Sequence, residues 1–117
     1  MSDYDPAAER AAIDWLALAD SGDASASWQA AATLFRRAVP EEQWQRSLAA
    51  AREPLGAVIS RELAGARYAT ELPGAPDGEY VVCQFNTVFE HKRTAIETVT
   101  PMRDSDGEWR VSGYFIR

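Results

Sequence analysis

The sequence predicts an α+β domain in which three N-terminal helices pack on one face of a curved four-stranded antiparallel sheet. Apolar residues recur at helical spacing through the first half of the chain and alternate with polar residues through the second half. Short segments rich in proline, glycine and aspartate separate the alternating stretches. The 117 residues, 46% of them hydrophobic, suffice for one core, so residues 1–117 are expected to form a single domain.

Three helices are predicted before residue 56. The first begins with Asp5 as a cap and Pro6 in the first turn, and it ends at the Ser-Gly-Asp segment 21–23. The second is expected from Ser25 or Ser27 to Val39, and the third from residue 40 to about residue 55. Their predicted buried faces are Ala8, Ala12, Trp15, Leu16 and Ala19, then Trp28, Ala31, Ala32, Phe35 and Val39, then Trp44, Leu48, Ala51 and Leu55.

Four strands are predicted in the second half. They cover residues 58–72 with an interruption near 64–65, then 79–92, 94–103 and 108–117. The segments 73–78 and 104–107 are rich in the residues that form turns. Because short turns join neighbouring strands, the strands are expected to run antiparallel.

Alternation assigns the two faces of the predicted sheet. Val81, Cys83, Phe85, Thr87 and Phe89 form the inward face of the longest strand. A turn centred on residues 92–93 places Ile96 and Thr98 inward, and the last hairpin then turns Trp109, Val111, Gly113 and Phe115 inward as well. The intervening residues are expected on the opposite, outer face.

The predicted outer face mixes aliphatic groups, amides, a tyrosine and charged residues, where a face exposed only to water carries mostly charged residues and threonine. This composition is typical of an interface, and we predict one contiguous surface that contacts a protein partner, a second copy of the chain being the first candidate. A covering segment of the same chain, or a partly wet face with scattered apolar residues, would account for it as well. The predicted surface comprises Tyr80, Gln84, Asn86, Glu97, Val99, Arg110, Ser112, Tyr114 and Ile116.

The second half also carries a family resemblance. The runs Pro76–Val82, Phe89–Lys92, Glu97–Val99 and Gly107–Ile116 resemble the C-terminal signature of a bacterial family known as domain of unknown function 4019. The runs Ala12–Leu16, Ser27–Trp28, Ala31–Ala32 and Arg52–Gly56 extend the resemblance over nearly the whole chain. The family has no activity to carry over, and its members resemble small secreted or envelope proteins. The order of helices and sheet also resembles the nuclear transport factor 2-like and cystatin-like architecture, which does not imply a function by itself.

Candidate catalytic residues are few. The single histidine, His91, lies at a strand end and is expected to be solvated, while the single cysteine, Cys83, is expected to be a packed thiol. Asp14 is the candidate acid if a cavity lies between helices and sheet, as in the isomerase-like enzymes of this architecture. With one histidine, one cysteine and no clustered carboxylates, no metal site is predicted, and no cofactor motif occurs.

Charge and hydropathy limit the partners. The net charge is −6 and the basic residues form no cluster, so nucleic acid is not an expected partner. No apolar run approaches the length of a membrane span, so no membrane insertion is expected. The first residues lack the features of a signal peptide, which predicts a cytoplasmic protein, or a periplasmic or secreted one if the start is engineered.

These observations predict a binding or interaction module without catalytic activity. Two alternatives stay open: a small-ligand-binding protein or acid-base enzyme that uses a cavity between helices and sheet, and a structural homodimer. A hollow interior with a buried ionisable group would favour the enzyme. A filled interior with a flat, partly apolar outer face would favour the interaction module.

Overall fold

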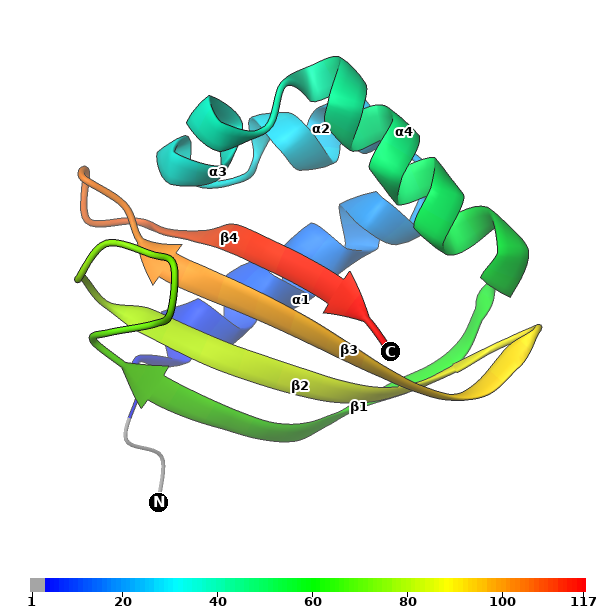
Figure 1. Cartoon of the computed structure of the whole chain (residues 1–117). Coiled ribbons are helices and arrows are strands. Elements are labelled where there is room, and N and C mark those ends of the chain that lie inside the picture. The colour runs from blue at the N-terminus through cyan, green and yellow to red at the C-terminus, as the bar shows by residue number, and fades with distance from the viewer. Residues whose placement is uncertain (1–3) are drawn as a thin grey trace.

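The computed structural model describes residues 4–117 and confirms the α+β class with a four-stranded antiparallel sheet (Figure 1). The strands lie in the order β1-β2-β3-β4, which is also their order along the chain. Within the described residues the helices are α1 (Pro6–Asp20), α2 (Ala24–Gln29), α3 (Thr33–Ala38), α4 (Glu41–Arg52) and a short 3₁₀ turn, η1 (Glu53–Leu55). The strands are β1 (Val58–Ala69), β2 (Tyr80–Phe89), β3 (Lys92–Arg103) and β4 (Trp109–Ile116).

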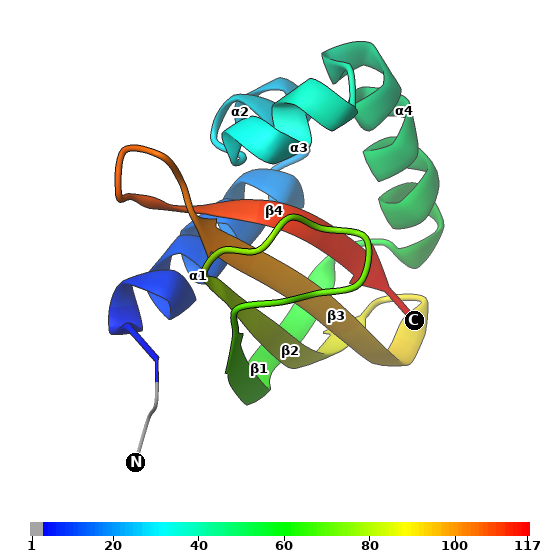
Figure 2. The same ribbon diagram turned by 60° about the vertical axis from the view of Figure 1, so that its left-hand side comes forward.

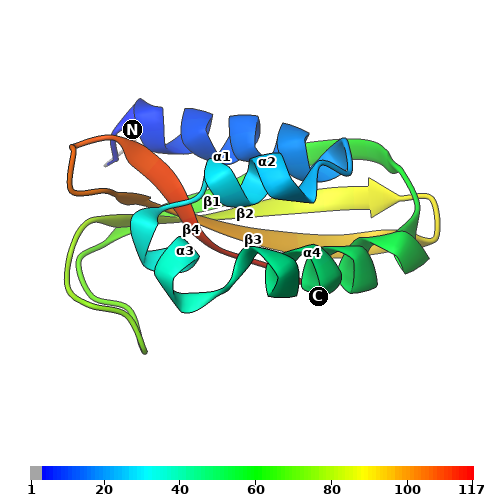
Figure 3. The same cartoon turned by 90° about the horizontal axis from the view of Figure 1, so that it is seen from above.

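Helix α1 lies across one face of the sheet, here called the inner face (Figure 3). Asp5 caps it as predicted, because its carboxylate accepts a hydrogen bond from the backbone N–H of Ala7 at 2.9 Å. The predicted stripe is confirmed: all its members are buried, namely Ala8, Ala12, Trp15, Leu16 and Ala19. The other helices gather beyond the β4 edge of the sheet (Figures 1 and 2).

The second predicted helix is in fact two helices, α2 and α3, so the described chain has four helices where three were expected. The break falls at Ala31 and Ala32, both buried, where the backbone of Ala32 is extended. Its N–H donates to the carbonyl of Val111 on β4 at 2.8 Å. Asp104, distant in the sequence, then accepts from the N–H and the hydroxyl of Thr33, each at 3.0 Å. These long-range bonds replace the helical ones that periodicity predicted.

The register between β2 and β3 differs by three residues from the prediction, because Ile96 pairs with Asn86 and not with Phe89. The inward face of β2 is as expected, but Phe89 pairs with Lys92, so the turn lies at Glu90 and His91. Both turn residues are bonded to the chain that enters β1: the N–H of Glu90 donates to Ala57 and that of His91 to Leu55, each at 2.9 Å. Between the pairs Phe89–Lys92 and Thr87–Ala95, β3 carries one extra residue, and this irregularity moves the rest of β3 to the other face. It brings Ala95, Glu97, Val99 and Pro101 inward and turns Ile96, Thr98, Thr100 and Met102 outward.

A bulge in β4 produces a second difference. Thr100 pairs with Gly113 and Pro101 with Val111, so Ser112 is an extra residue. Trp109 and Val111 lie on the inner face and Arg110 on the outer face, as predicted. Beyond the bulge the assignment was wrong: Tyr114 and Ile116 turn inward and Phe115, 55% exposed, turns outward.

The space between helices and sheet is filled by aromatic side chains. The ring of Trp15 lies 5.9 Å from that of Trp44 and 5.1 Å from that of Tyr114, measured between centroids. Ser27 binds both tryptophans: its carbonyl accepts from the indole N–H of Trp15 and its hydroxyl from that of Trp44, each at 2.9 Å. The interior therefore has closely packed aromatic rings, and the indole N–H groups of Trp15 and Trp44 both have acceptors.

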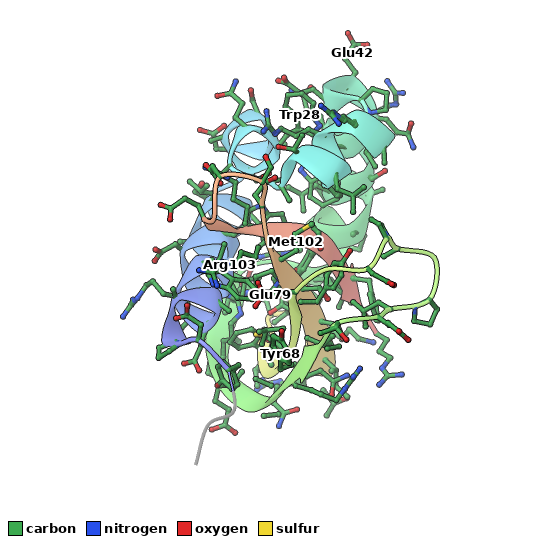
Figure 4. The ribbon with its side chains drawn as sticks, turned by 90° about the vertical axis from the view of Figure 1, so that its left-hand side faces the viewer. Trp28, Glu42, Tyr68, Glu79, Met102 and Arg103 are labelled. Atoms are coloured by element: carbon green, nitrogen blue, oxygen red, sulfur yellow. The ribbon has the colours of Figure 1, made fainter. Side chains whose placement is uncertain are left out.

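At the other end of the sheet, the 70–79 connection folds over part of the outer face (Figure 2). The hydroxyl of Tyr80 donates to the carbonyl of Pro76 at 2.6 Å, and Tyr80 is only 1% exposed. Figure 4 labels Tyr68, Glu79 and Arg103 at this end. Glu79 accepts from Tyr68 at 3.3 Å and pairs with Arg103 at 3.8 Å, which ties the ends of β1, β2 and β3 together.

Candidate functional site

A buried carboxylate, Glu97, lies at the centre of a polar cluster on the inner face. Glu97 is fully buried in the middle of β3. One of its oxygens accepts from Nε of Arg61 at 2.7 Å and from the hydroxyl of Thr87 at 2.6 Å, and the other accepts from the hydroxyl of Tyr114. Since a buried carboxylate without partners is very costly, these three donors explain how the sheet holds it.

Asp20, at the end of α1, links two arginines to this cluster. Its carboxylate receives both terminal nitrogens of Arg61, at 2.7 and 2.9 Å, and one of Arg52 at 2.8 Å. Although burial alone raises the pKa of Asp20, the hydrogen bonds and charges of Arg61 and then Arg52 bring it below its usual value. Burial likewise lowers the pKa of Arg61, but Asp20 and Glu97 raise it well above its usual range.

Tyr114 and Arg52 close the cluster on the side of α4. Burial, followed by the charge of Glu97 and the hydrogen bond to it, raises the pKa of Tyr114 far above its usual value. Arg52 lies 3.5 Å from the Tyr114 hydroxyl, and its guanidinium stands 5.0 Å from the centre of the Phe89 ring. The two acids and two arginines balance in charge, and Glu97 already has three donors. The cluster therefore joins α1, α4 and all four strands of the sheet.

Sequence reasoning missed this cluster. Asp20, Arg52 and Arg61 were not singled out, and Glu97 was assigned to the outer face. One signal was available: Glu97 is a lone carboxylate in a strand of threonines and aliphatic residues, and a buried charge needs a cation. Asp14, the predicted cavity acid, is exposed on α1.

The predicted contact surface does not lie on one face. Gln84, Asn86 and Arg110 lie on the outer face, while Glu97, Val99, Tyr114 and Ile116 lie on the inner face because of the two register differences. Tyr80 is on the outer face under the 70–79 connection, and Ser112, in the bulge, donates to the carbonyl of Thr100 at 2.9 Å. Arg110 is occupied by Asp104 and Asp106 of its own hairpin.

Other residues take the vacated outer positions. Ile96 and Thr98 of β3 and Phe115 of β4 stand beside Asn86 and Gln84. A hollow of about 490 Å³ opens on this face across β1, β2 and β3. The outward side chains that line it are Ser60, Glu62, Asn86, Val88, Thr94 and Ile96, with Arg93 at the hairpin.

The remaining candidates are placed as follows. Cys83 is buried on the inner face, and burial, with a smaller contribution from the charge of Glu9, raises the pKa of its thiol to about 11. His91 is exposed in the β2–β3 turn. Between residues 4 and 117, no three histidine, cysteine, aspartate or glutamate side chains gather as a metal-binding group. In the same range, no helix has the length and hydropathy to cross a membrane.

A second hollow, of about 430 Å³, separates α4 from the end of β4. We call it the α4–β4 groove. Its lining residues are Trp44, Ser47, Leu48, Ala51 and Leu55 on one side and Lys92, Tyr114, Phe115, Ile116 and Arg117 on the other.

The fold and these surfaces define an α+β domain with an aromatic interior, a charge-balanced polar cluster and open surface hollows. The chain belongs to the family described as "Protein of unknown function (DUF4019)", whose profile matches residues 11–114, and this confirms the family resemblance. Comparison with curated proteins and with solved structures found no match. The resemblance to the nuclear transport factor 2-like architecture therefore stays a prediction.

Proposed function

We propose that this chain is a non-catalytic interaction module that binds a protein partner through its outer sheet face, and that the partner is a second copy of the chain. The observation that supports it most is the contrast between the two faces. The inner face is filled by Trp15, Trp44 and Tyr114 and by a polar cluster whose charges balance. The outer face leaves Asn86, Val88 and Ile96 around an open hollow.

Charge on the hollow favours a second copy as the partner. Glu62 of β1 and Arg93 of the hairpin line the same hollow, and neither is in an ion pair within the described part of the chain. Under a two-fold axis, Glu62 of one copy can face Arg93 of the other, so the face complements itself. Val88 and Ile96 supply apolar contact between these charges.

The cavity enzyme has less support. An acid-base catalyst needs an ionisable group that a substrate can reach. Glu97 is the buried acid beneath the sheet, and its oxygens already accept from Arg61, Thr87 and Tyr114. A substrate would have to displace these bonds to reach it.

Light scattering over a concentration series tests the proposal. The native chain is expected to change from monomer to dimer mass, and Val88→Lys is expected to stay monomeric because it places a charge within the apolar part of the hollow. Ile13→Lys is the matched control, since Ile13 is 40% exposed on α1, against the opposite face. A native chain that is monomeric throughout, or a Val88→Lys chain that dimerises like the control, would contradict the proposal.

A further inference from the structure

The edge of β4 that faces away from β3 offers unpaired backbone groups. Ile96 and Arg117 exchange both backbone hydrogen bonds, at 2.8 and 3.0 Å, so they form a hydrogen-bonded pair of the antiparallel ladder. Such pairs alternate along the strands, which makes Thr98 and Phe115 the next one. The N–H and C=O groups of Tyr114 and Ile116 therefore point away from β3, toward the α4–β4 groove.

The chain itself already uses one place on this edge. Upstream of the bulge, the extended residue Ala32 donates its N–H to the carbonyl of Val111 at 2.8 Å. The linker between α2 and α3 thus donates one backbone hydrogen bond to this edge of β4. At Tyr114 and Ile116, the corresponding place is the α4–β4 groove.

The walls of the groove select the chemistry of an occupant. Trp44, Leu48 and Leu55 present apolar side chains from the side of α4. Lys92 and Arg117 line the same groove and form no ion pair within residues 4–117, so this region carries positive charge in a chain of net charge −6. Because α4 runs beside the β4 edge (Figure 1), a second sheet added at this edge would collide with the helix, so the occupant of the groove is taken to be a single extended segment.

We propose that the α4–β4 groove binds an extended segment of a partner polypeptide as an added strand on β4. The backbone of the segment pairs with the N–H and C=O groups of Tyr114 and Ile116. Its apolar side chains pack against α4, and an acidic side chain of the segment pairs with Lys92 or Arg117. This site is separate from the outer-face hollow, because Val88 and Ile96 line the hollow but not the groove, and residues of α4 line the groove but not the hollow.

A random heptapeptide library displayed on phage tests the groove directly. Selection on the immobilised full chain is expected to enrich peptides with alternating apolar positions and an acidic residue. Ala51→Glu is expected to weaken their binding at least tenfold, because Ala51 is an exposed α4 residue that lines the groove. Ala50→Glu is the matched control, since Ala50 is exposed on the same helix but does not line the groove.

Two further measurements separate strand addition from simple hydrophobic contact. N-methylation of every second amide of an enriched peptide removes half of its backbone donors. Two such peptides can be made, with the odd or the even amides methylated, and only one of them is expected to lose binding. Amide exchange at Tyr114 and Ile116 is expected to slow when the peptide binds. No enrichment over the Ala51→Glu chain, equal binding by both N-methylated peptides, or unchanged exchange would overturn the proposal. If Val88→Lys abolished the binding of the enriched peptides and Ala51→Glu did not, the peptides would bind the outer-face hollow. That result would overturn the groove proposal but leave the outer-face proposal standing.

Discussion

Replacing Arg61 with methionine removes the cation that, among residues 4–117, forms an ion pair with Glu97, and it is expected to destabilise the fold strongly. Arg61 bonds Glu97 at 2.7 Å and holds Asp20 with two further hydrogen bonds. Methionine keeps much of the aliphatic length of the side chain but leaves the Glu97 carboxylate without a counter-charge. The polar cluster, not the aliphatic packing, is therefore what the substitution perturbs.

The burial of Glu97 sets the size of the effect. Its side chain has no exposed surface, so water cannot replace the lost guanidinium. Removing one partner of a buried pair costs about 3–5 kcal/mol because it leaves an uncompensated charge. For 117 residues, unfolding entropy converts this to a decrease in melting temperature of about 12–20 °C. Since the free energy of unfolding of a domain is roughly 5–15 kcal/mol, the variant stays folded only if the native protein lies above the lower end of that range.

Urea unfolding followed by tryptophan fluorescence measures the change, because Trp15 and Trp44 are buried near the cluster. Arg67→Met is the matched control: Arg67 is exposed on the same strand, and its loss is expected to change the free energy of unfolding by less than about 0.5 kcal/mol. Adding Glu97→Gln to Arg61→Met is expected to recover much of the loss, since a neutral amide needs no cation. A loss below about 1 kcal/mol, or no recovery in the double variant, would refute the structural role of the pair.

Three other outcomes are expected. Labelling of Cys83 by a thiol reagent at pH 8 should be far slower in the folded protein than in urea, since burial raises its pKa to about 11; equal rates would contradict its position. Asp104→Ala should lower the free energy of unfolding by about 1–2 kcal/mol, because Asp104 caps α3 through Thr33. The hydrogen bond from the backbone N–H of Thr33 is the main reason that the pKa of Asp104 lies below its usual value. The native protein should therefore lose stability below about pH 4, and the loss should be smaller in Asp104→Ala. The pKa of Tyr114 is raised, so its contribution is present below about pH 10 and is lost as the pH rises further, and Tyr114→Phe should lessen the alkaline decline in urea unfolding.

Local pattern was enough to predict α1 and the four strands. The helical stripe of α1 and its Asp5 cap, and the alternation of β2, depend on neighbours within a few residues, and both are as predicted. The break between α2 and α3 was not predictable in this way. It depends on Val111 and Asp104, which lie more than 70 residues further along the chain and supply the bonds that stop the helix.

The sequence by itself determined the α+β class, the order of helices and strands, the family and the inward face of β2. Which of Glu97 or Thr98 faces inward was decided by the tertiary structure. Alternation is unchanged by a slip of one residue, so it fixes two sets of side chains but not which set is buried. The bonds from Glu90 and His91 to the chain entering β1 hold the turn, and the extra β3 residue just after the turn brings Glu97 to the face of Arg61. Contacts between distant segments therefore determined the polar cluster, the outer-face hollow and the α4–β4 groove.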